Sequence, residues 1–189
     1  MSVNRQANPA NPSGGQVAWP LRCGSPPALT QGFVARPESA PGLNHVLQPG
    51  TAVALTPARA ARAAVQPGSP DWAGSVGKTQ LAAYFADKLW QANELELLLW
   101  VNAASRVSIL SAYAAAAAAV LGVDPAGGDG EAAAARFVSW LSETSRAWLV
   151  VLDDLSTAQD VEGLWPAGPV GRTLVTTSEP PAALGGEHL

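Results

Sequence analysis

The sequence predicts an α/β fold in which a parallel β-sheet is flanked by helices on both faces, as a three-layer sandwich. Two patterns favour this fold class. Near-continuous apolar runs at 95–101 and 147–155 are typical of strands that are buried on both faces of a parallel sheet. Segments with helical periodicity alternate with such runs along the chain, as they do in right-handed β-α-β crossovers.

The composition indicates a globular protein and disfavours several classes of function. The 189 residues are 48% hydrophobic and 14% charged, which is enough for a buried core. A net charge of −4 and an isoelectric point near 5.1 give no basic surface for direct nucleic acid binding. No apolar run reaches the roughly 18 residues of a membrane span, and the N-terminus lacks the apolar stretch of a secretion signal. The single cysteine, Cys23, cannot form an internal disulfide, so we expect a cytoplasmic protein with no membrane partner.

Three regions of the chain differ in composition. Residues 1–18 are rich in Asn, Pro, Ser and Gly, and we expect a disordered leader there. Residues 19–50 combine prolines, which forbid long elements, with apolar residues that need a surface to pack on. We therefore expect an irregular segment on the domain edge. Residues 51–189 hold the alternating pattern and form the main domain.

The first half of this domain is predicted to contain two or three strands and one helix. Residues 51–56 and 63–66 are short strand candidates, and one of them should lead into the loop before the first helix. That helix is predicted within 79–92, where apolar side chains recur every three or four residues. The apolar run 95–101 forms the next strand.

The second half begins with an alanine-rich helix at 108–124. Alanine has the highest helix propensity, Ser105 or Ser108 is a suitable N-cap, and Gly122 is expected to end the helix. The remaining predicted elements are a helix within 131–145 and strands at 147–155 and 171–178.

The stretch SPDWAGSVGKTQLA, residues 69–82, ends like a phosphate-binding loop of the form GxxxxGK[ST]. In such a loop, backbone N–H groups at a helix N-terminus surround the phosphates, because the positive end of the helix dipole favours an anion. Lys78 is predicted to reach the β- and γ-phosphates, and the Thr79 hydroxyl to bind Mg²⁺. The predicted nucleotide-binding residues of this stretch are Gly74, Ser75, Val76, Gly77, Lys78, Thr79 and Gln80.

Two consecutive carboxylates lie near the end of the most apolar predicted strand. Strand 147–155 brings Asp153 and Asp154 to the C-terminal edge of the sheet, where parallel sheets bind their ligands. Asp153 is predicted to hold the Mg²⁺ hydration shell, and Asp154 to polarise an attacking water. An isolated pair of aspartates is more often a solvated turn or a helix cap. Together with the GKT sequence the pair favours a nucleotide site, with catalytic roles for Asp154 and Lys78.

At these motifs the chain resembles the nucleotide-binding domain of STAND-class signal-transduction ATPases, of the NB-ARC type, and especially actinobacterial regulators with helical repeats. GSVGKTQLA is similar to their phosphate loop, a P-loop NTPase feature, and LLLWVNAAS to their second strand. WLVVLDDL is similar to their Walker B strand, and GLWPAGPVGRTLVTTS to a stretch that ends in a phosphate sensor, here Thr177. FVARPE, residues 33–38, resembles a motif near the adenine, which implies adenine contacts from Phe33, Val34 and Arg36.

The resemblance covers roughly residues 19–177 and implies a switch that holds ADP or ATP with Mg²⁺. The family continues with a fifth strand, a helical region and a winged-helix domain. Residues 51–189 therefore correspond to a C-terminally truncated nucleotide-binding domain. The partners that the resemblance implies are the nucleotide, other domains of a longer regulator, and further copies of the chain through self-association.

Three positions depart from the family pattern. Trp72 stands where the first loop glycine is expected, at the exit from the strand, where a side chain with negative φ is tolerated. Ala35 and Pro37 alter the motif near the adenine. Ser178 occupies the position of an arginine and cannot neutralise the charge that develops on the γ-phosphate. Since such an arginine contributes about 10³- to 10⁵-fold in rate, we expect slow hydrolysis.

Two other arginines in the sequence bear on this missing charge. Arg172 lies six residues before Ser178, so an extended strand places it roughly 20 Å away, at the far end. Arg106 follows the second strand and is closer in topology.

The sequence thus favours a Mg²⁺-dependent ATP- or ADP-binding switch module with weak ATPase activity, from a signalling or transcription regulator. The alternative is a degenerate phosphate-loop scaffold, in which Trp72 fills the phosphate cradle and the surface binds a partner protein without nucleotide. A small-molecule kinase is disfavoured, because no arginine-rich lid segment follows the Walker B strand.

Overall fold

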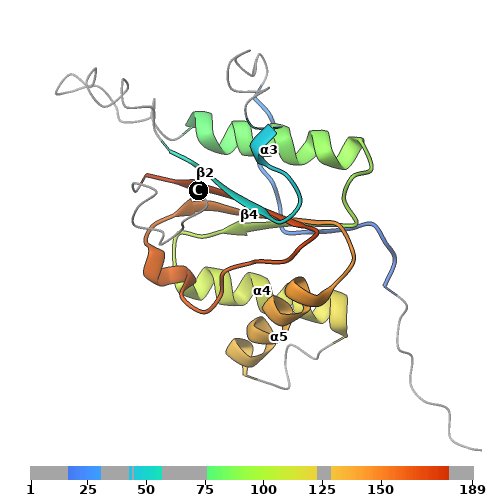
Figure 1. Ribbon diagram of the computed structural model, residues 1–189. Coiled ribbons are helices and arrows are strands. Elements are labelled where there is room, and N and C mark those ends of the chain that lie inside the picture. The colour runs from blue at the N-terminus through green and yellow to red at the C-terminus, as the bar shows by residue number, and fades with distance from the viewer. Residues whose placement is uncertain (1–16, 31–42, 44, 57–75, 123–128, 179–189) are drawn as a thin grey trace, which may run out of the picture.

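The computed structural model describes residues 17–30, 43, 45–56, 76–122 and 129–178. In this part of the chain, five parallel strands form one sheet in the order β1-β3-β4-β5-β2 (Figure 1). The elements are β1 (Leu21–Cys23), β2 (Thr51–Leu55), α3 (Val76–Gln91), β3 (Leu97–Asn102), α4 (Arg106–Leu121), α5 (Gly130–Glu143), β4 (Trp148–Leu155), the 3-10 helix η2 (Ala158–Val161) and β5 (Gly171–Thr177). The predicted α/β fold with a parallel sheet is confirmed.

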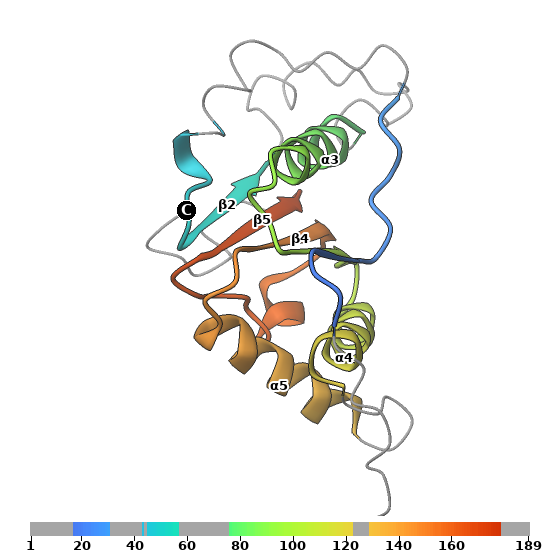
Figure 2. The ribbon, with the colours of Figure 1, turned by 90° about the vertical axis from the view of Figure 1, so that its right-hand side faces the viewer.

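Helices cover both faces of the sheet and give three layers. Figure 2 shows α3 on one face and α4 with α5 on the other. Strand residues alternate between the two cores, as the period of two along a strand requires. On β4, for example, Leu149 and Val151 pack toward α3, whereas Trp148 and Val150 pack toward α4 and α5. This alternation explains why the strands read as continuous apolar runs.

The N-terminal segment contributes more regular structure than the sequence indicated. Leu21–Cys23 forms the edge strand β1, which pairs with β3 in the register Leu21 to Leu97. Three residues are too few to show an alternating pattern, so the strand was not recognisable from the sequence. The predicted strand at 51–56 is β2, whereas the candidate at 63–66 lies outside the described residues.

Helix α4 begins and ends at capping residues that the sequence predicted. The Ser105 hydroxyl accepts a hydrogen bond from the backbone N–H of Ser108 at 3.3 Å, which satisfies one of the free donors of the first turn. At the other end, Gly122 adopts the left-handed conformation with φ of 67°, and its N–H donates to the Ala118 carbonyl.

Tyr113 is a polar defect in the core between α4 and α5. The side chain is fully buried beside Phe137, and its hydroxyl finds no hydrogen-bond partner among the described residues. Burial raises the pKa of Tyr113, because the phenolate would lose its hydration. The hydroxyl therefore lowers the stability of the folded state.

We expect Tyr113→Phe to raise the free energy of unfolding by about 1 kcal/mol at neutral pH, because the substitution removes an unpaired buried group. Because the folded-state pKa is raised, the wild type should also lose stability as the pH rises above about 10, where tyrosine ionises in the unfolded chain. The phenylalanine variant should lack that part of the loss. Urea unfolding at pH 7 and pH 10.5 measures both effects, and a less stable variant at pH 7 would contradict the assignment.

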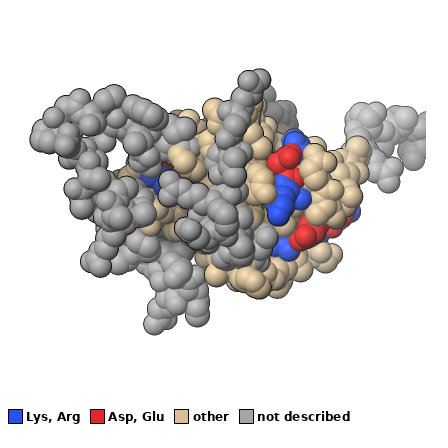
Figure 3. Space-filling model, turned by 90° about the horizontal axis from the view of Figure 1, so that it is seen from above, with Lys and Arg blue, Asp and Glu red and all other residues tan. Residues whose placement is uncertain are grey.

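Charged side chains on the α3 side of the molecule occur with both signs next to each other (Figure 3). Arg22 of β1 pairs with Asp87 of α3 at 3.5 Å, and its guanidinium lies 4.3 Å from the centre of the Trp90 ring. Arg172 of β5 pairs with Glu94 at 3.1 Å. Each of these two arginines is thus paired with a neighbouring carboxylate.

In the part of the chain that the structure describes, no helix is both long and apolar enough to cross a membrane.

Candidate functional site

The first turn of α3 meets the C-terminal ends of β4 and β5 at a cluster of three polar side chains. Two hydroxyls donate to the same carboxylate oxygen, Oδ1 of Asp153. The Thr79 hydroxyl of α3 lies 2.8 Å from this oxygen, and the Thr176 hydroxyl of β5 lies 2.6 Å from it. The carboxylate therefore joins the helix to the strand at the edge of the sheet where parallel sheets bind ligands.

A bulge in β4 presents both aspartates at this edge. Leu152 pairs with Val175 and Leu155 with Thr177, so two residues of β4 lie opposite one residue of β5. Those two residues are Asp153 and Asp154. Bulges of this kind are uncommon between parallel strands and often redirect a side chain beside a functional site.

The bulge changes which face of the sheet the following residue occupies. In a regular strand, Leu155 would share a face with Val151 and Asp153. Instead, Leu155 packs into the core beneath α4 and α5, together with Leu152. Asp154 is exposed at the end of the sheet and belongs to neither core. Its φ is 61°, a left-handed conformation that is unusual for a residue other than glycine.

Lys78 carries the positive charge of the cluster. Its side chain is half-buried, and burial lowers its pKa, while the charges of Asp154 and Asp153 act in the opposite direction. The ammonium group thus lies within electrostatic reach of both carboxylates. Lysines with perturbed pKa values beside carboxylates occur at functional sites and also in structural ion-pair networks.

The N-terminus of α3 adds backbone donors to the same place. The first N–H groups of a helix have no partner within the helix, and the helix dipole makes this end positive. Gly77 is exposed in this turn, and a methyl group at its Cα would meet no atom within 4 Å. The first turn contains no acidic residue that would compete with an anion. A side chain at position 77 would therefore meet no described atom outside its own helix and chain neighbours.

Several predicted binding residues lie outside the described part of the chain. They are Phe33, Val34, Arg36, Gly74 and Ser75. Trp72, at the position of the first loop glycine, also lies outside it. The structure describes the backbone of Val76 as the first residue of α3.

Gln80, predicted to bind the nucleotide, uses its side chain within the protein. It is 7% exposed, and its amide oxygen accepts hydrogen bonds from the backbone N–H and the hydroxyl of Thr30, at 2.8 and 3.0 Å. Its amide nitrogen donates to the Ala28 carbonyl at 3.2 Å. The Gln80 side chain therefore fastens the segment that follows β1 onto α3.

Of the two threonines that end β5, the structure brings Thr176 to the cluster. The Thr177 hydroxyl, the predicted phosphate contact, donates to the Leu155 carbonyl at 2.8 Å, and the side chain is buried. Thr176 was not singled out from the sequence. The signal that identifies it is the alternation along β5: Thr176 shares the α3 face with Leu174, whereas Thr177 shares the opposite face with Val175.

The donor set at this edge fits Mg²⁺. A hydroxyl has one proton and two lone pairs, so Thr79 can donate to Asp153 and still offer oxygen to a cation. Mg²⁺ prefers oxygen ligands and is commonly held by one or two carboxylates together with substrate phosphates. No cluster of three or more His, Cys, Asp or Glu side chains suited to a metal occurs among the described residues. Thr79 and Asp153 are the residues that would hold such a cation at this edge of the sheet.

Arg106 and Arg172 form their hydrogen bonds and ion pairs away from this cluster. Arg106 donates to the Glu162 carbonyl at 2.7 Å and pairs with Glu131 at 3.1 Å, on the side of α4 and α5. Arg172 is 8% exposed and pairs with Glu94. Neither guanidinium is part of the Asp153 cluster.

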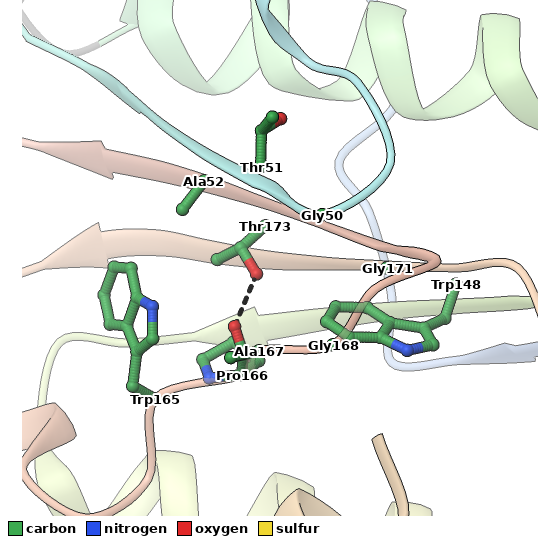
Figure 4. Close-up of a pocket in the computed structure, with 10 residues that line it drawn as sticks. All are labelled: Gly50, Thr51, Ala52, Trp148, Trp165, Pro166, Ala167, Gly168, Gly171 and Thr173. Atoms are coloured by element: carbon green, nitrogen blue, oxygen red, sulfur yellow. Dashed lines mark hydrogen bonds between the residues drawn. The ribbon is translucent and has the colours of Figure 1, made fainter. Parts of the chain in front are cut away.

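A cavity of about 450 Å³ lies at the opposite edge of the sheet, around the N-terminal ends of β2, β4 and β5 (Figure 4). Its lining contains no charged side chain, and the Thr173 hydroxyl is bonded to the Pro166 carbonyl at 2.9 Å. The lining residues are Gly50, Thr51, Ala52, Trp148, Trp165, Pro166, Ala167, Gly168, Gly171 and Thr173. This cavity lacks groups for acid, base or metal chemistry, so the Asp153 cluster is the stronger candidate site.

Comparison of the chain with protein-family models, with curated proteins and with solved structures gives no match.

Proposed function

We propose that the chain is an ATP- or ADP-binding switch module with slow Mg²⁺-dependent ATPase activity. One observation carries the proposal: the Thr79 hydroxyl at the start of α3 is hydrogen-bonded to Asp153 at the end of β4. This bond brings together the hydroxyl of the GKT sequence and the acid of a buried strand, which are far apart in the chain. Lys78 completes the arrangement from the same helical turn.

Each residue has a separate role in the proposal. The N–H groups of the first turn of α3 and the Lys78 ammonium bind the phosphates. Thr79 and Asp153 hold the metal, which when bound neutralises phosphate charge and polarises the transferred phosphoryl group. Asp154, exposed beside them, orients and polarises the attacking water.

Hydrolysis is expected to be slow because the described residues place no arginine at the cluster. Arg106 and Arg172 are bonded to other acids and carbonyls, and Ser178 follows β5 where the family that the sequence resembles has arginine. Phosphate binding depends less on such a residue, since backbone N–H groups, Lys78 and the metal contribute most of it. The chain is therefore proposed as a switch that retains its nucleotide, with other domains of a regulator and further copies of itself as partners.

A nucleotide that binds only the folded state must stabilise that state. We expect ADP and a non-hydrolysable ATP analogue to raise the midpoint of thermal unfolding, and to do so more strongly with Mg²⁺ than with EDTA. At a ligand concentration 100 times Kd, the stabilisation amounts to about 2.7 kcal/mol. Adenosine, which lacks phosphates, is the matched control and should give a much smaller shift. Equal shifts with adenosine and ADP would contradict phosphate recognition.

A scaffold without nucleotide remains the competing function, and one observation favours it. Both hydroxyls of the cluster already have an acceptor in Asp153 without any ligand. The cluster could therefore serve only to join α3 to the sheet. This function predicts no change in unfolding midpoint with any nucleotide, with or without Mg²⁺.

A further inference from the structure

We propose that Thr176 is the positioning residue that holds the β4 bulge in the conformation needed for magnesium-dependent nucleotide binding. The inference rests on the proposed function and assigns the magnesium dependence of the site to a residue outside the GKT and aspartate motifs. Thr176 is the single residue of β5 that lies opposite both Asp153 and Asp154.

The Thr176 hydroxyl makes one bond to each residue of the bulge. It donates to Oδ1 of Asp153 at 2.6 Å and accepts from the backbone N–H of Asp154 at 2.8 Å. A bulge interrupts the ladder of backbone hydrogen bonds between two strands. The hydroxyl therefore supplies an acceptor for the Asp154 N–H, while its proton fixes the neighbouring carboxylate.

The Asp154 backbone needs such a partner. Its φ of 61° is a conformation that costs a non-glycine residue free energy, and it persists only where surrounding contacts enforce it. The hydrogen bond from its N–H to Thr176 is one of those contacts. Loss of the bond would let the bulge relax and would move both carboxylates.

Thr176 is also rigid enough to position a carboxylate. It is 1% exposed and lies within β5, which has strands on both sides, β4 and β2. Its β-branched side chain has few rotamers available. Together with Thr79 it fixes Oδ1 of Asp153 from two separate elements. Partners that orient a metal ligand in this way typically change metal affinity by about 10- to 100-fold when they are removed.

The chain offers a control for the general cost of removing a buried hydroxyl. Thr173 lies on the same strand, is equally buried, and donates to a backbone carbonyl, that of Pro166, at 2.9 Å. It lies three residues before Thr176 on β5, which is about 10 Å along an extended strand, and its side chain faces the opposite side of the sheet. Thr173→Val and Thr176→Val therefore differ in whether the aspartates lose a partner.

The test is a calorimetric measurement of ADP affinity in Mg²⁺ and in EDTA. For the wild type, Mg²⁺ should increase the affinity, and Thr176→Val should reduce that increase by about tenfold or more, with a small change in EDTA. Thr176→Ser, which keeps the hydroxyl, should retain most of the increase, and Thr173→Val should retain all of it. Thr176→Ala removes the hydroxyl without adding a methyl group and replaces the valine variant if circular dichroism shows that variant to be unfolded.

Two contrary outcomes have different meanings. If the wild type binds ADP and either hydroxyl-free variant keeps the full effect of Mg²⁺, Thr176 does not position the metal site and the proposed function stands. If the folded wild type binds no ADP in either buffer, the proposed function fails and this inference fails with it.

Discussion

Replacing Lys78 by alanine is expected to weaken the binding of ADP and ATP by about 10- to 100-fold. The side chain is half-buried beside Asp153 and Asp154, and its ammonium is the positive side chain assigned to the phosphates. A hydrogen bond to a charged group contributes about 1.5–3 kcal/mol, which corresponds to this range of affinity. Fluorescence anisotropy with a labelled nucleotide, in the presence of Mg²⁺, measures the loss.

Lys88→Ala is the matched control for that variant. Lys88 lies on the same helix, in the last turn, where its ammonium is 5.7 Å from the centre of the Tyr84 ring. Its removal changes the net charge by the same amount but leaves the N-terminus of α3 intact. Equal loss of affinity in both variants would indicate general electrostatic attraction, and an unchanged affinity in Lys78→Ala would contradict a phosphate site at this turn.

Replacing Gly171 by alanine is expected to lower the free energy of unfolding by about 3 kcal/mol, the upper part of the usual range for overpacking. Gly171 begins β5, and a methyl group at its Cα would overlap three atoms of the Trp148 indole. The indole cannot easily move, because it is buried and its Nε1 donates to the Leu141 carbonyl at 3.0 Å. Urea unfolding monitored by circular dichroism measures the change.

Gly130→Ala tests whether this loss comes from the contact or from glycine replacement in general. Gly130 is the first residue of α5, and a methyl group there would meet no atom within 4 Å. Because alanine restricts the unfolded chain and suits a helix, this variant should be as stable as the wild type, or more stable by up to about 1 kcal/mol. A Gly171→Ala protein of wild-type stability would contradict the packing described around Trp148.

The fold was predictable because its three central strands, β3, β4 and β5, are largely buried on both faces. The run that contains Trp148 and Val151 has no polar residue before Asp153, and such runs are characteristic of strands in a parallel sheet that is covered on both faces by helices. Thr79 and Asp153 were also predicted as a pair, and they are joined by a hydrogen bond. Strand order places them together, since β4 ends at the edge where α3 begins.

The details of the site that were not predicted depend on backbone irregularity and on contacts distant in sequence. The bulge at Asp153 and Asp154 shifts the alternation of β4 by one residue, and the residue types in that stretch do not predict it. The choice between Thr176 and Thr177, by contrast, follows from the alternation along β5 itself, which places Thr176 on the face of Leu174. Gln80 follows the GKT sequence directly, yet its side chain bonds a segment 50 residues earlier in the chain.

The most direct test of the account is a calorimetric titration of the full chain with a non-hydrolysable ATP analogue in Mg²⁺. The account predicts saturable binding near one nucleotide per chain, which weakens in EDTA and in Lys78→Ala. The absence of binding heat at two temperatures, with circular dichroism showing a folded protein, would contradict the nucleotide switch and leave the cluster of Thr79, Asp153 and Thr176 as a structural link between α3 and the sheet.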